Sequence, residues 1–288
     1  MRESSKSLKV KAKSMASQKN ITVQEVMQSY MFERILARIS RSQYRDNFIL
    51  KGGLLLSSIS GIQSRTTMDM DTMLRGLELE KEKLKIILDE ILSIDANDGV
   101  IFEVLGIEEI RVEDFYGGLR FKINGLLDNI RNYLSIDIST GDIITPSEVE
   151  YQYKMIFEDQ YILIKSYNLE TILAEKFQTV LESNGAKGRM KDYYDIWFFV
   201  NFRWNVIDFD LLNKAIFNTC TQRNSIGVLN RIDEILDIIL NSSIHRKRWD
   251  EYSSKHNYTK HVSFESVINS LFEFSKKVNR NGSRSIKV

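Results

Sequence analysis

Apolar residues recur at helical spacing between residues 22 and 41. Seven apolar side chains mostly lie three or four positions apart, as on one face of an α-helix: Val23, Val26, Met27, Tyr30, Ile35, Leu36 and Ile39. Thr22 followed by Glu25 fits a capping box, in which a hydroxyl and a carboxylate exchange hydrogen bonds with free backbone amides. We therefore expect a helix to begin at Thr22.

Between residues 47 and 138 the pattern changes to short apolar runs. The run before Gly52 and Gly53 is a strand or the end of a helix, and the leucines after these glycines indicate a buried helical stretch. Residues 67–74 alternate polar and apolar side chains, which is the period of a strand. The pattern also predicts an amphipathic helix over 79–92 and strands over 100–105, 107–112, 118–123 and 132–138.

After Pro146, the single proline, the pattern changes again. A last strand is expected over 161–164, and helical spacing then continues almost to the end of the chain. The helices are predicted over 169–182, 191–201, 208–218, 225–239 and 264–277. The sequence therefore predicts an α+β protein in three parts, which are a helical N-terminal arm (1–45), a mixed α/β domain (46–165) and an all-helical C-terminal domain (166–288).

Composition narrows the classes of function. The chain has 288 residues, 43% of them hydrophobic, which excludes a wholly disordered protein. Lys and Arg number 40 against 39 Asp and Glu, so the formal net charge is +1 and any nucleic-acid contact must be local. Cys220 is the single cysteine, so neither an intrachain disulfide nor a cysteine metal cluster can form.

Targeting signals are not evident in the sequence. Met1 is not followed by the apolar segment of a signal peptide, and no apolar stretch approaches the ~20 residues that a membrane span needs. We therefore expect a cytoplasmic protein with no membrane partner.

Asp69 and Asp71 are the sharpest chemical signal. Carboxylates at i and i+2 on a strand point to the same face. There their oxygens can hold hard divalent cations side by side, as phosphoryl or nucleotidyl transfer requires. Upstream, Gly52 and Gly53 would let the backbone approach a phosphate, with the amides of the following helix directed at the anion. Either pattern alone is weak, and an Asp-x-Asp pair is more often a solvated strand face. Their order and proximity make the combination more specific.

Asp137 is the candidate for a third carboxylate on a neighbouring strand. It would complete a metal site or accept the proton of the attacking hydroxyl. A charged residue flanked by Ile136 and Ile138 faces either solvent or a site, and spacing alone does not decide between the two.

Four stretches together resemble the AbiEii/AbiGii-type bacterial toxins, which belong to the nucleotidyltransferase superfamily with the polymerase-beta-like fold. They are residues 30–36 leading into 47–53, residues 65–71, residues 173–177 and residues 188–197. The resemblance extends over residues 20–277. It implies a mixed sheet with helices, followed by an all-helical C-terminal domain, and an enzyme that uses NTP and two Mg²⁺ ions.

The resemblance also implies roles for individual residues. Gly52 and Gly53 would approach the triphosphate, Asp69 and Asp71 would bind Mg²⁺, Lys176 would contact the nucleotide phosphates, and Asp192 or Asp195 would belong to the last motif. The first motif of the superfamily usually reads Gly-Ser, whereas here Leu54 follows Gly53. A hydroxyl contact to phosphate is therefore missing or comes from elsewhere, with Ser57 and Ser58 as candidates.

The helical motifs have a second interpretation. From the residues alone, Lys176 on an apolar helix is more often a surface side chain than a phosphate ligand. Asp192 and Asp195, at i and i+3, are either a helix-start carboxylate with an ordinary ion pair or an acidic pair that orients Lys176 or Arg189 or contacts the nucleotide. Arg65 and Arg189 are further phosphate candidates.

Two basic segments could contact an RNA backbone. These are the Lys-rich N-terminus and residues 245–248, although charge runs are usually solvated faces.

Together these features predict a Mg²⁺-dependent nucleotidyltransferase. The resemblance implies the toxin of a toxin–antitoxin or abortive-infection (phage-defence) pair, whose partner would be an antitoxin from the same operon. The acceptor would be RNA such as a tRNA 3′ end, and a protein side chain stays open. The alternative is a catalytically silent nucleotide- or RNA-binding module on the same fold. A purely structural helical protein would leave Asp69 and Asp71 unexplained.

Overall fold

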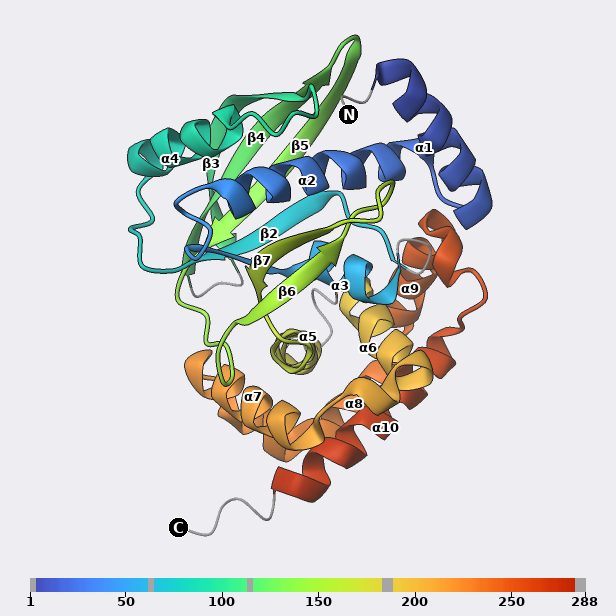
Figure 1. The fold of residues 1–288 in the computed structure, drawn as a ribbon. Helices are drawn as coiled ribbons and strands as arrows, with labels where there is room; N and C mark the ends of the chain where they lie inside the picture. Colours follow the sequence, from blue (N-terminus) through green and yellow to red (C-terminus); the bar gives the residue numbers. More distant parts are fainter. Residues whose placement is uncertain (1–3, 62–64, 113–115, 183–188, 283–288) are drawn as a thin grey trace. The chain divides into compact units, whose positions relative to one another are not determined.

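The structure is a computed structural model that describes residues 4–61, 65–112, 116–182 and 189–282 (Figure 1). The chain divides into two compact units, one formed by residues 1–142 and 148–167 and the other by residues 143–147 and 168–288. The segment that the sequence assigns to a separate N-terminal arm lies in the first unit.

The first unit is a mixed α/β structure. Its helices are α1 (Ser5–Lys19), α2 (Val23–Arg41), α3 (Gly52–Ser60) and α4 (Lys81–Ser93). Its strands are β1 (Phe48–Lys51), β2 (Asp69–Leu74), β3 (Ile101–Val112), β4 (Tyr116–Leu127), β5 (Ile130–Ser139), β6 (Val149–Lys154) and β7 (Tyr161–Ser166). They form one sheet in the order β3-β4-β5-β2-β1-β7-β6, in which the β2–β5 and β1–β7 pairs are parallel and the other pairs are antiparallel. The predicted α+β class with a mixed sheet is confirmed.

Helix α2 lies across one face of this sheet (Figure 1) and contacts β5 and β7. It begins where the sequence predicts. Thr22 Oγ1 accepts a hydrogen bond from the Glu25 amide at 3.1 Å, and Glu25 Oε2 accepts one from the Thr22 amide at 2.7 Å. This capping box satisfies two of the backbone donors that a helix N-terminus leaves free.

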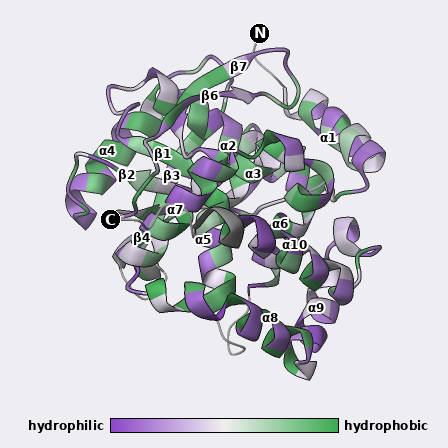
Figure 2. Cartoon of the chain, turned by 90° about the horizontal axis from the view of Figure 1, so that it is seen from below, coloured by the Kyte–Doolittle hydropathy of each residue, from purple (hydrophilic) through white to green (hydrophobic). Residues whose placement is uncertain are grey.

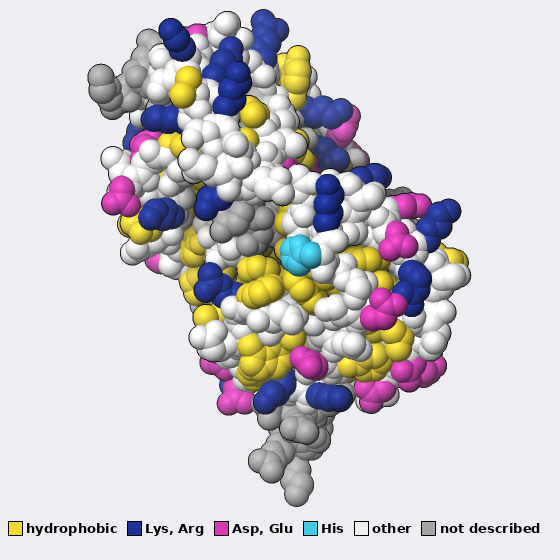
Figure 3. Space-filling model, turned by 90° about the vertical axis from the view of Figure 1, so that its right-hand side faces the viewer, with side chains coloured by type: hydrophobic (Ala, Val, Ile, Leu, Met, Phe, Trp, Pro, Cys, Tyr) yellow, Lys and Arg dark blue, Asp and Glu magenta, His cyan; other side chains and the backbone are white. Residues whose placement is uncertain are grey.

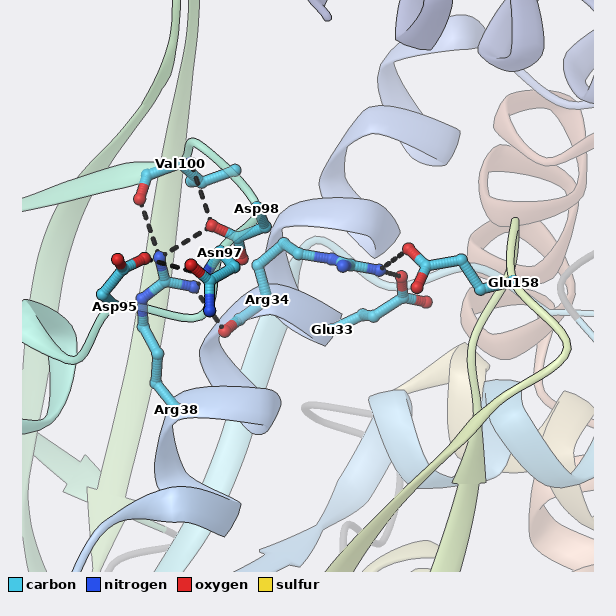
Figure 4. Close-up of polar contacts among 8 residues, drawn as sticks. All are labelled: Glu33, Arg34, Arg38, Asp95, Asn97, Asp98, Val100 and Glu158. Atoms are coloured by element: carbon cyan, nitrogen blue, oxygen red, sulfur yellow. Dashed lines mark hydrogen bonds and ion pairs between the residues drawn. The ribbon is translucent and has the colours of Figure 1, made fainter. Parts of the chain in front are cut away.

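Helix α2 also buries charged side chains (Figure 4). Arg38 is 2% exposed and donates to Asp98 at 2.8 and 2.9 Å and to the Val100 carbonyl at 2.7 Å. Burial alone would raise the pKa of Asp98, but the hydrogen bonds and charge of Arg38 lower it below its ordinary value. Arg38 therefore joins α2 to the segment that leads into β3.

A second buried charge pair lies one helical turn earlier on α2 (Figure 4). Arg34 forms ion pairs with Glu33 and, at 2.8 Å, with Glu158, while Glu33 accepts a hydrogen bond from the Ile156 amide at 2.8 Å. Burial raises the pKa of Glu33, although the charge and hydrogen bond of Arg34 oppose the rise. These contacts join α2 to the turn between β6 and β7.

Three predictions in this unit need correction. The two strands expected over 100–105 and 107–112 are one strand, β3, whose register against β4 shifts between Val104 and Gly106. A β-bulge of this kind breaks the side-chain alternation that the sequence pattern depends on. Strand β6 was not predicted, because it alternates little between buried and exposed positions. Helix α1 lies in the predicted helical arm, but its bounds were not predicted, because it buries only Leu8, Ala12 and Ala16.

The second unit is helical, as predicted. It contains α5 (Leu169–Glu182), α6 (Met190–Phe202), α7 (Phe209–Gln222), α8 (Ile232–Leu240), α9 (Ser243–Lys255) and α10 (Phe264–Gly282), with short 3₁₀ segments at Trp204–Val206, Ile226–Arg231 and Asn257–Thr259. The predicted helix over 225–239 is therefore a 3₁₀ segment followed by α8, and α9 was not predicted. Helix α5 is seen end-on in Figure 1 and packs against α6, α7 and α8.

Aromatic and amphipathic packing forms the core of this unit. The Phe177 ring of α5 meets the Phe274 ring of α10 edge to face, with 5.0 Å between the centroids. Helix α8 shows both hydrophilic and hydrophobic residues in Figure 2, as expected for a helix with one buried face. Of the helices in the described ranges, none has the length and apolar character to cross a membrane.

Replacing Arg38 with methionine tests the role of its buried ion pair. The variant leaves the Asp98 carboxylate buried without its cation, so we expect the free energy of unfolding to fall by about 3–5 kcal/mol. Urea denaturation measures this change. Lys85→Met, which removes the exposed pair with Asp89 on α4, is the matched control and should change stability little. Equal losses in the two variants would contradict this role.

Candidate active site

Three carboxylates and one guanidinium lie close together on three neighbouring strands of the first unit, β2, β5 and β4. Asp69 and Asp71 occupy the less buried positions of β2. In the strand register Asp71 lies opposite Asp137 on the parallel strand β5, and Asp137 lies opposite Arg120 on the antiparallel strand β4. Cross-strand partners direct their side chains to the same face of a sheet. The sheet therefore brings Asp69, Asp71 and Asp137 together on one face, a question that spacing alone left open for Asp137, and the chemical roles of the three stay a prediction.

Arg120 binds Asp137 through two parallel hydrogen bonds. Its Nε and Nη2 donate to the two carboxylate oxygens at 2.7 Å each, and the Asp137 side chain is 16% exposed. The hydrogen bond to Asp137 raises the pKa of Arg120, and the negative charges of Asp69 and Asp71 add to this rise. The four charged groups thus form one electrostatic cluster.

The two glycines allow the start of α3 to approach this cluster. Gly52 has φ +66°, and a Cβ atom there would lie 2.2 Å from Asp71 Oδ2. A Cβ atom on Gly53 would lie 2.7 Å from both Arg65 Nη1 and Thr67 Oγ1. The Gly53 amide points at Asp71 Oδ2 from 3.5 Å. At Gly52 both the positive φ and the nearby carboxylate favour glycine, whereas a side chain at Gly53 would displace Arg65 or Thr67. The approach places the positive end of α3 beside these groups.

Arg65 and Ser57, both predicted to contact phosphate, are bonded to backbone in this structure. Arg65 is buried and donates to the Thr66 carbonyl at 2.8 Å, while the Ser57 hydroxyl donates to the Arg65 carbonyl at 2.7 Å. Ser57 therefore holds the segment that carries Arg65 against Gly53. The role of both residues toward phosphate stays a prediction.

A further buried group lies beside the cluster and was missed by sequence reasoning. Lys51, the residue opposite Asp71 in the β1–β2 register, forms an ion pair with Asp142. The Tyr167 hydroxyl donates to Asp142 at 2.9 Å, and its ring lies 5.7 Å from the Lys51 ammonium. The sequence did contain a signal for Lys51, because a lysine at the end of an apolar strand, directly before Gly52, is an unusual position for a charged residue.

Arg120 was also missed. The alternation of Arg120 and Lys122 with apolar residues along the predicted strand was its signal, but its partner Asp137 could be identified only from the register of β4 on β5.

The second unit brings Lys176, Asp192 and Asp195 together. The Lys176 ammonium on α5 lies 2.5 Å from Asp192 and 2.8 Å from Asp195, both on α6, and all three side chains are at most 10% exposed. The surface interpretation of Lys176, which the pattern alone favoured, is therefore wrong. Arg189, at the N-terminus of α6, lies 3.6 Å from Asp192 and is 45% exposed. Residue 188 of the same motif lies outside the described residues.

The two basic segments differ in what they offer to RNA. His245 is completely buried and Arg246 is paired with Glu265, so residues 245 and 246 do not form a free basic surface. In α1, by contrast, Lys6, Lys9 and Lys13 are exposed. Lys and Arg side chains gather in the upper part of Figure 3, where α1 lies.

Some of the donor atoms in this cluster suit a divalent cation, and others are already bound. Asp69 and Asp71 supply the hard carboxylate oxygens that Mg²⁺ prefers, and the missing side chain of Gly52 accommodates the Asp71 carboxylate. In the ranges that the structure describes, however, no three acidic, His or Cys side chains are arranged as a metal site. Asp137 is bound by Arg120, so its role as a third metal ligand stays a prediction.

A carboxylate pair on a mixed sheet, beside a glycine turn that opens a helix, is an arrangement suited to enzymes that transfer phosphoryl or nucleotidyl groups. Residues 34–270 match the family model described as nucleotidyl transferase AbiEii toxin, type IV TA system. The chain belongs to this AbiEii family of nucleotidyltransferase toxins.

Solved structures with low sequence identity share the fold. JHP933 from Helicobacter pylori is 13% identical, with a TM-score of 0.53 over 91% of this chain and 95% of that one. A candidate nucleotidyltransferase from H. pylori is 12% identical, with a TM-score of 0.52 over 93% of this chain and all of the other. No curated protein matches the chain significantly in sequence.

Replacing Gly52 with alanine tests the close approach of α3 to Asp71. The new Cβ would meet the Asp71 carboxylate, and alanine at positive φ costs about 1–2 kcal/mol. We expect a loss of stability of at least that size in urea denaturation, together with weaker Mn²⁺ binding in calorimetry. Gly117→Ala on β4 is the control, because nothing lies within 4 Å of a Cβ there. If Gly52→Ala bound Mn²⁺ as tightly as the wild type, the result would contradict a role of the glycine turn in shaping the metal site.

Proposed function

We propose that this enzyme is a Mg²⁺-dependent toxin that transfers a nucleoside monophosphate from NTP to the terminal hydroxyl of an RNA such as tRNA. The observation that carries the proposal is the pair Asp69 and Asp71 on one sheet face, next to the Gly52–Gly53 turn. The family supplies the coarser part of this statement, which is an NTP substrate, nucleotidyl transfer and an antitoxin partner.

The residues of the first unit divide the chemistry among them. Asp69 and Asp71 would hold Mg²⁺, which supplies charge stabilisation at the transferring phosphoryl group when bound. The amide of Gly53 and the positive end of α3 would face the triphosphate, with Arg65 behind them. Asp137 would accept the proton of the acceptor hydroxyl or act as a third metal ligand.

The transfer itself is a substitution at phosphorus. The acceptor oxygen forms a bond to the α-phosphorus of the NTP, and the bond from that phosphorus to the bridging oxygen of the β-phosphate breaks. Pyrophosphate leaves with the bonding electron pair. The hydroxyl proton passes to Asp137 when this carboxylate serves as the base, or to solvent when it serves as a metal ligand. No redox change occurs, and the electrostatic work lies in stabilising the charge on the transferring group.

From the second unit we assign Lys176 to the nucleotide phosphates. Asp192 and Asp195 would fix the position of its ammonium, because both carboxylates contact it and are themselves buried. Arg189 is exposed enough to add a further phosphate contact.

Modification of an RNA end that must stay free would stop translation and arrest growth. This consequence fits a toxin whose cognate antitoxin, from the same operon, holds it in check, and such an arrest would limit phage replication. NTP and tRNA are both cytoplasmic, so we place the reaction in the cytoplasm.

Replacing Asp71 with asparagine tests the proposal. The variant keeps the side-chain size but removes a metal-binding charge, so label transfer from α-labelled NTP to bulk tRNA should fall at least about 100-fold. Growth arrest on expression should disappear, while the unfolding midpoint stays near that of the wild type. Asp89→Asn on α4 is the control and should retain full activity.

The same assay on the wild type and on Asp71→Asn distinguishes the transferase from the silent module and an RNA acceptor from a protein acceptor. A variant Asp71→Asn that still transfers label and remains toxic would overturn the assigned site. Wild-type protein that binds NTP but labels nothing in the presence of Mg²⁺ and RNA would favour the catalytically silent module. Label on protein alone would identify a protein acceptor.

A further inference from the structure

One face of strand β5 leads directly to the carboxylate cluster. Burial alternates along this strand, with the less buried positions on the face that carries Asp137. Those positions are Arg131, Tyr133, Ser135 and Asp137. The opposite face is buried and carries Ile130, Asn132, Leu134 and Ile136. The cation of Arg131, the ring of Tyr133 and the hydroxyl of Ser135 thus lie in a row along the strand before Asp137.

Tyr133 lies where strand β5 extends beyond the end of β2. Its side chain is 67% exposed, and its residue pairs with Asn124 of β4, whereas the pairing with β2 begins only at Ser135. A large ring left in water contributes little to the core of this unit. Its exposure instead makes a flat surface available to a ligand.

The strand that carries this ring is held firmly from the other side. Gln28 of α2 donates its side-chain amide to the Tyr133 carbonyl at 3.3 Å and to the Met68 carbonyl at 3.0 Å. Gln24 of the same helix donates to the Asn132 side chain at 2.8 Å. These contacts fix the backbone beneath Tyr133 and join it to the segment that enters β2. The ring is therefore presented from a rigid support, which lowers the entropy cost of binding.

The distances along the strand suit a polymer. At ~3.4 Å per residue, Tyr133 lies ~14 Å and Arg131 ~20 Å along β5 from Asp137. A protein side-chain acceptor needs contacts only near its reacting hydroxyl. An aromatic ring and a guanidinium at increasing distance instead match a chain whose repeating units carry both a base and a phosphate.

We propose that Arg131 and Tyr133 form the docking track for the single-stranded end of the acceptor RNA. A base stacks on the Tyr133 ring, Arg131 contacts a backbone phosphate, and the terminal hydroxyl reaches the Asp137 end of the strand. Stacking tolerates any base, so the track orients the RNA end without selecting its sequence. This inference rests on the proposed RNA acceptor.

Binding of RNA without NTP or metal tests the track separately from catalysis. Fluorescence anisotropy with a short 5′-labelled single-stranded RNA would compare the wild type with Tyr133→Ala, Tyr133→Phe and Arg131→Gln. We expect Tyr133→Ala to weaken binding about tenfold, because it removes one stacking contact, and Tyr133→Phe to bind as the wild type. Arg131→Gln should reduce the slope of log K against log salt by about 0.7, the value for one phosphate contact on a single strand.

Two controls match these changes in kind. Tyr161→Ala removes another exposed tyrosine, 54% exposed on β7, and Lys81→Gln removes an exposed cation at the start of α4. Both should bind RNA as the wild type does. Thermal unfolding of each variant verifies that the fold is intact.

A transfer assay on the same proteins separates failure of the track from failure of the proposed function. Wild-type transfer to RNA, with binding and transfer unchanged in Tyr133→Ala, would overturn the track and leave the transferase standing. Loss of RNA binding in Tyr133→Ala, with no transfer by the wild type, would support the track and overturn the proposed reaction. Wild-type protein that neither binds nor labels RNA would overturn both.

Discussion

The repulsion among three carboxylates on one sheet face is the constraint on which the site depends. Asp71 and Asp137 are register partners on strands about 4.8 Å apart, and Asp69 lies two residues along β2 on the same face. Like charges directly across a strand pair are destabilising. Arg120 offsets this repulsion by binding Asp137 through both carboxylate oxygens. A divalent cation at Asp69 and Asp71 would offset it further, so the same unfavourable arrangement that costs stability would favour binding of a metal in the proposed site.

The surroundings of the cluster hold its geometry. The φ of Gly52 and the absence of its side chain let α3 begin against Asp71. On the far side of the sheet, α2 is fixed by its capping box and by the buried Arg38–Asp98 pair. In the second unit, Lys176 is held between Asp192 and Asp195 in the same manner. Asp137 and Lys176 thus have their positions set by charged partners before any substrate arrives, which is the kind of preorganisation that favours catalysis.

Much of this could be predicted from local pattern, and the rest could not, for a physical reason. The alternation around Asp69 and Asp71, the glycine pair and the capping box at Thr22 are local signals, and the structure contains all three elements. Arg120 and Lys51 act through partners on other strands or segments, and no periodicity specifies which strand lies alongside or in what register. The burial of Lys176 likewise depends on how α6 packs on α5. Pairing across the fold, rather than element type, is what the sequence left undetermined.

Anomalous scattering from Mn²⁺ in crystals grown with a non-hydrolysable NTP would test the central claim most directly. The account predicts a peak within coordination distance of both Asp69 and Asp71, with the triphosphate at the start of α3. The same crystals would reveal whether Asp137 has exchanged Arg120 for the metal. A peak elsewhere, or none beside the Asp69–Asp71 pair at saturating Mn²⁺ and nucleotide, would contradict the account.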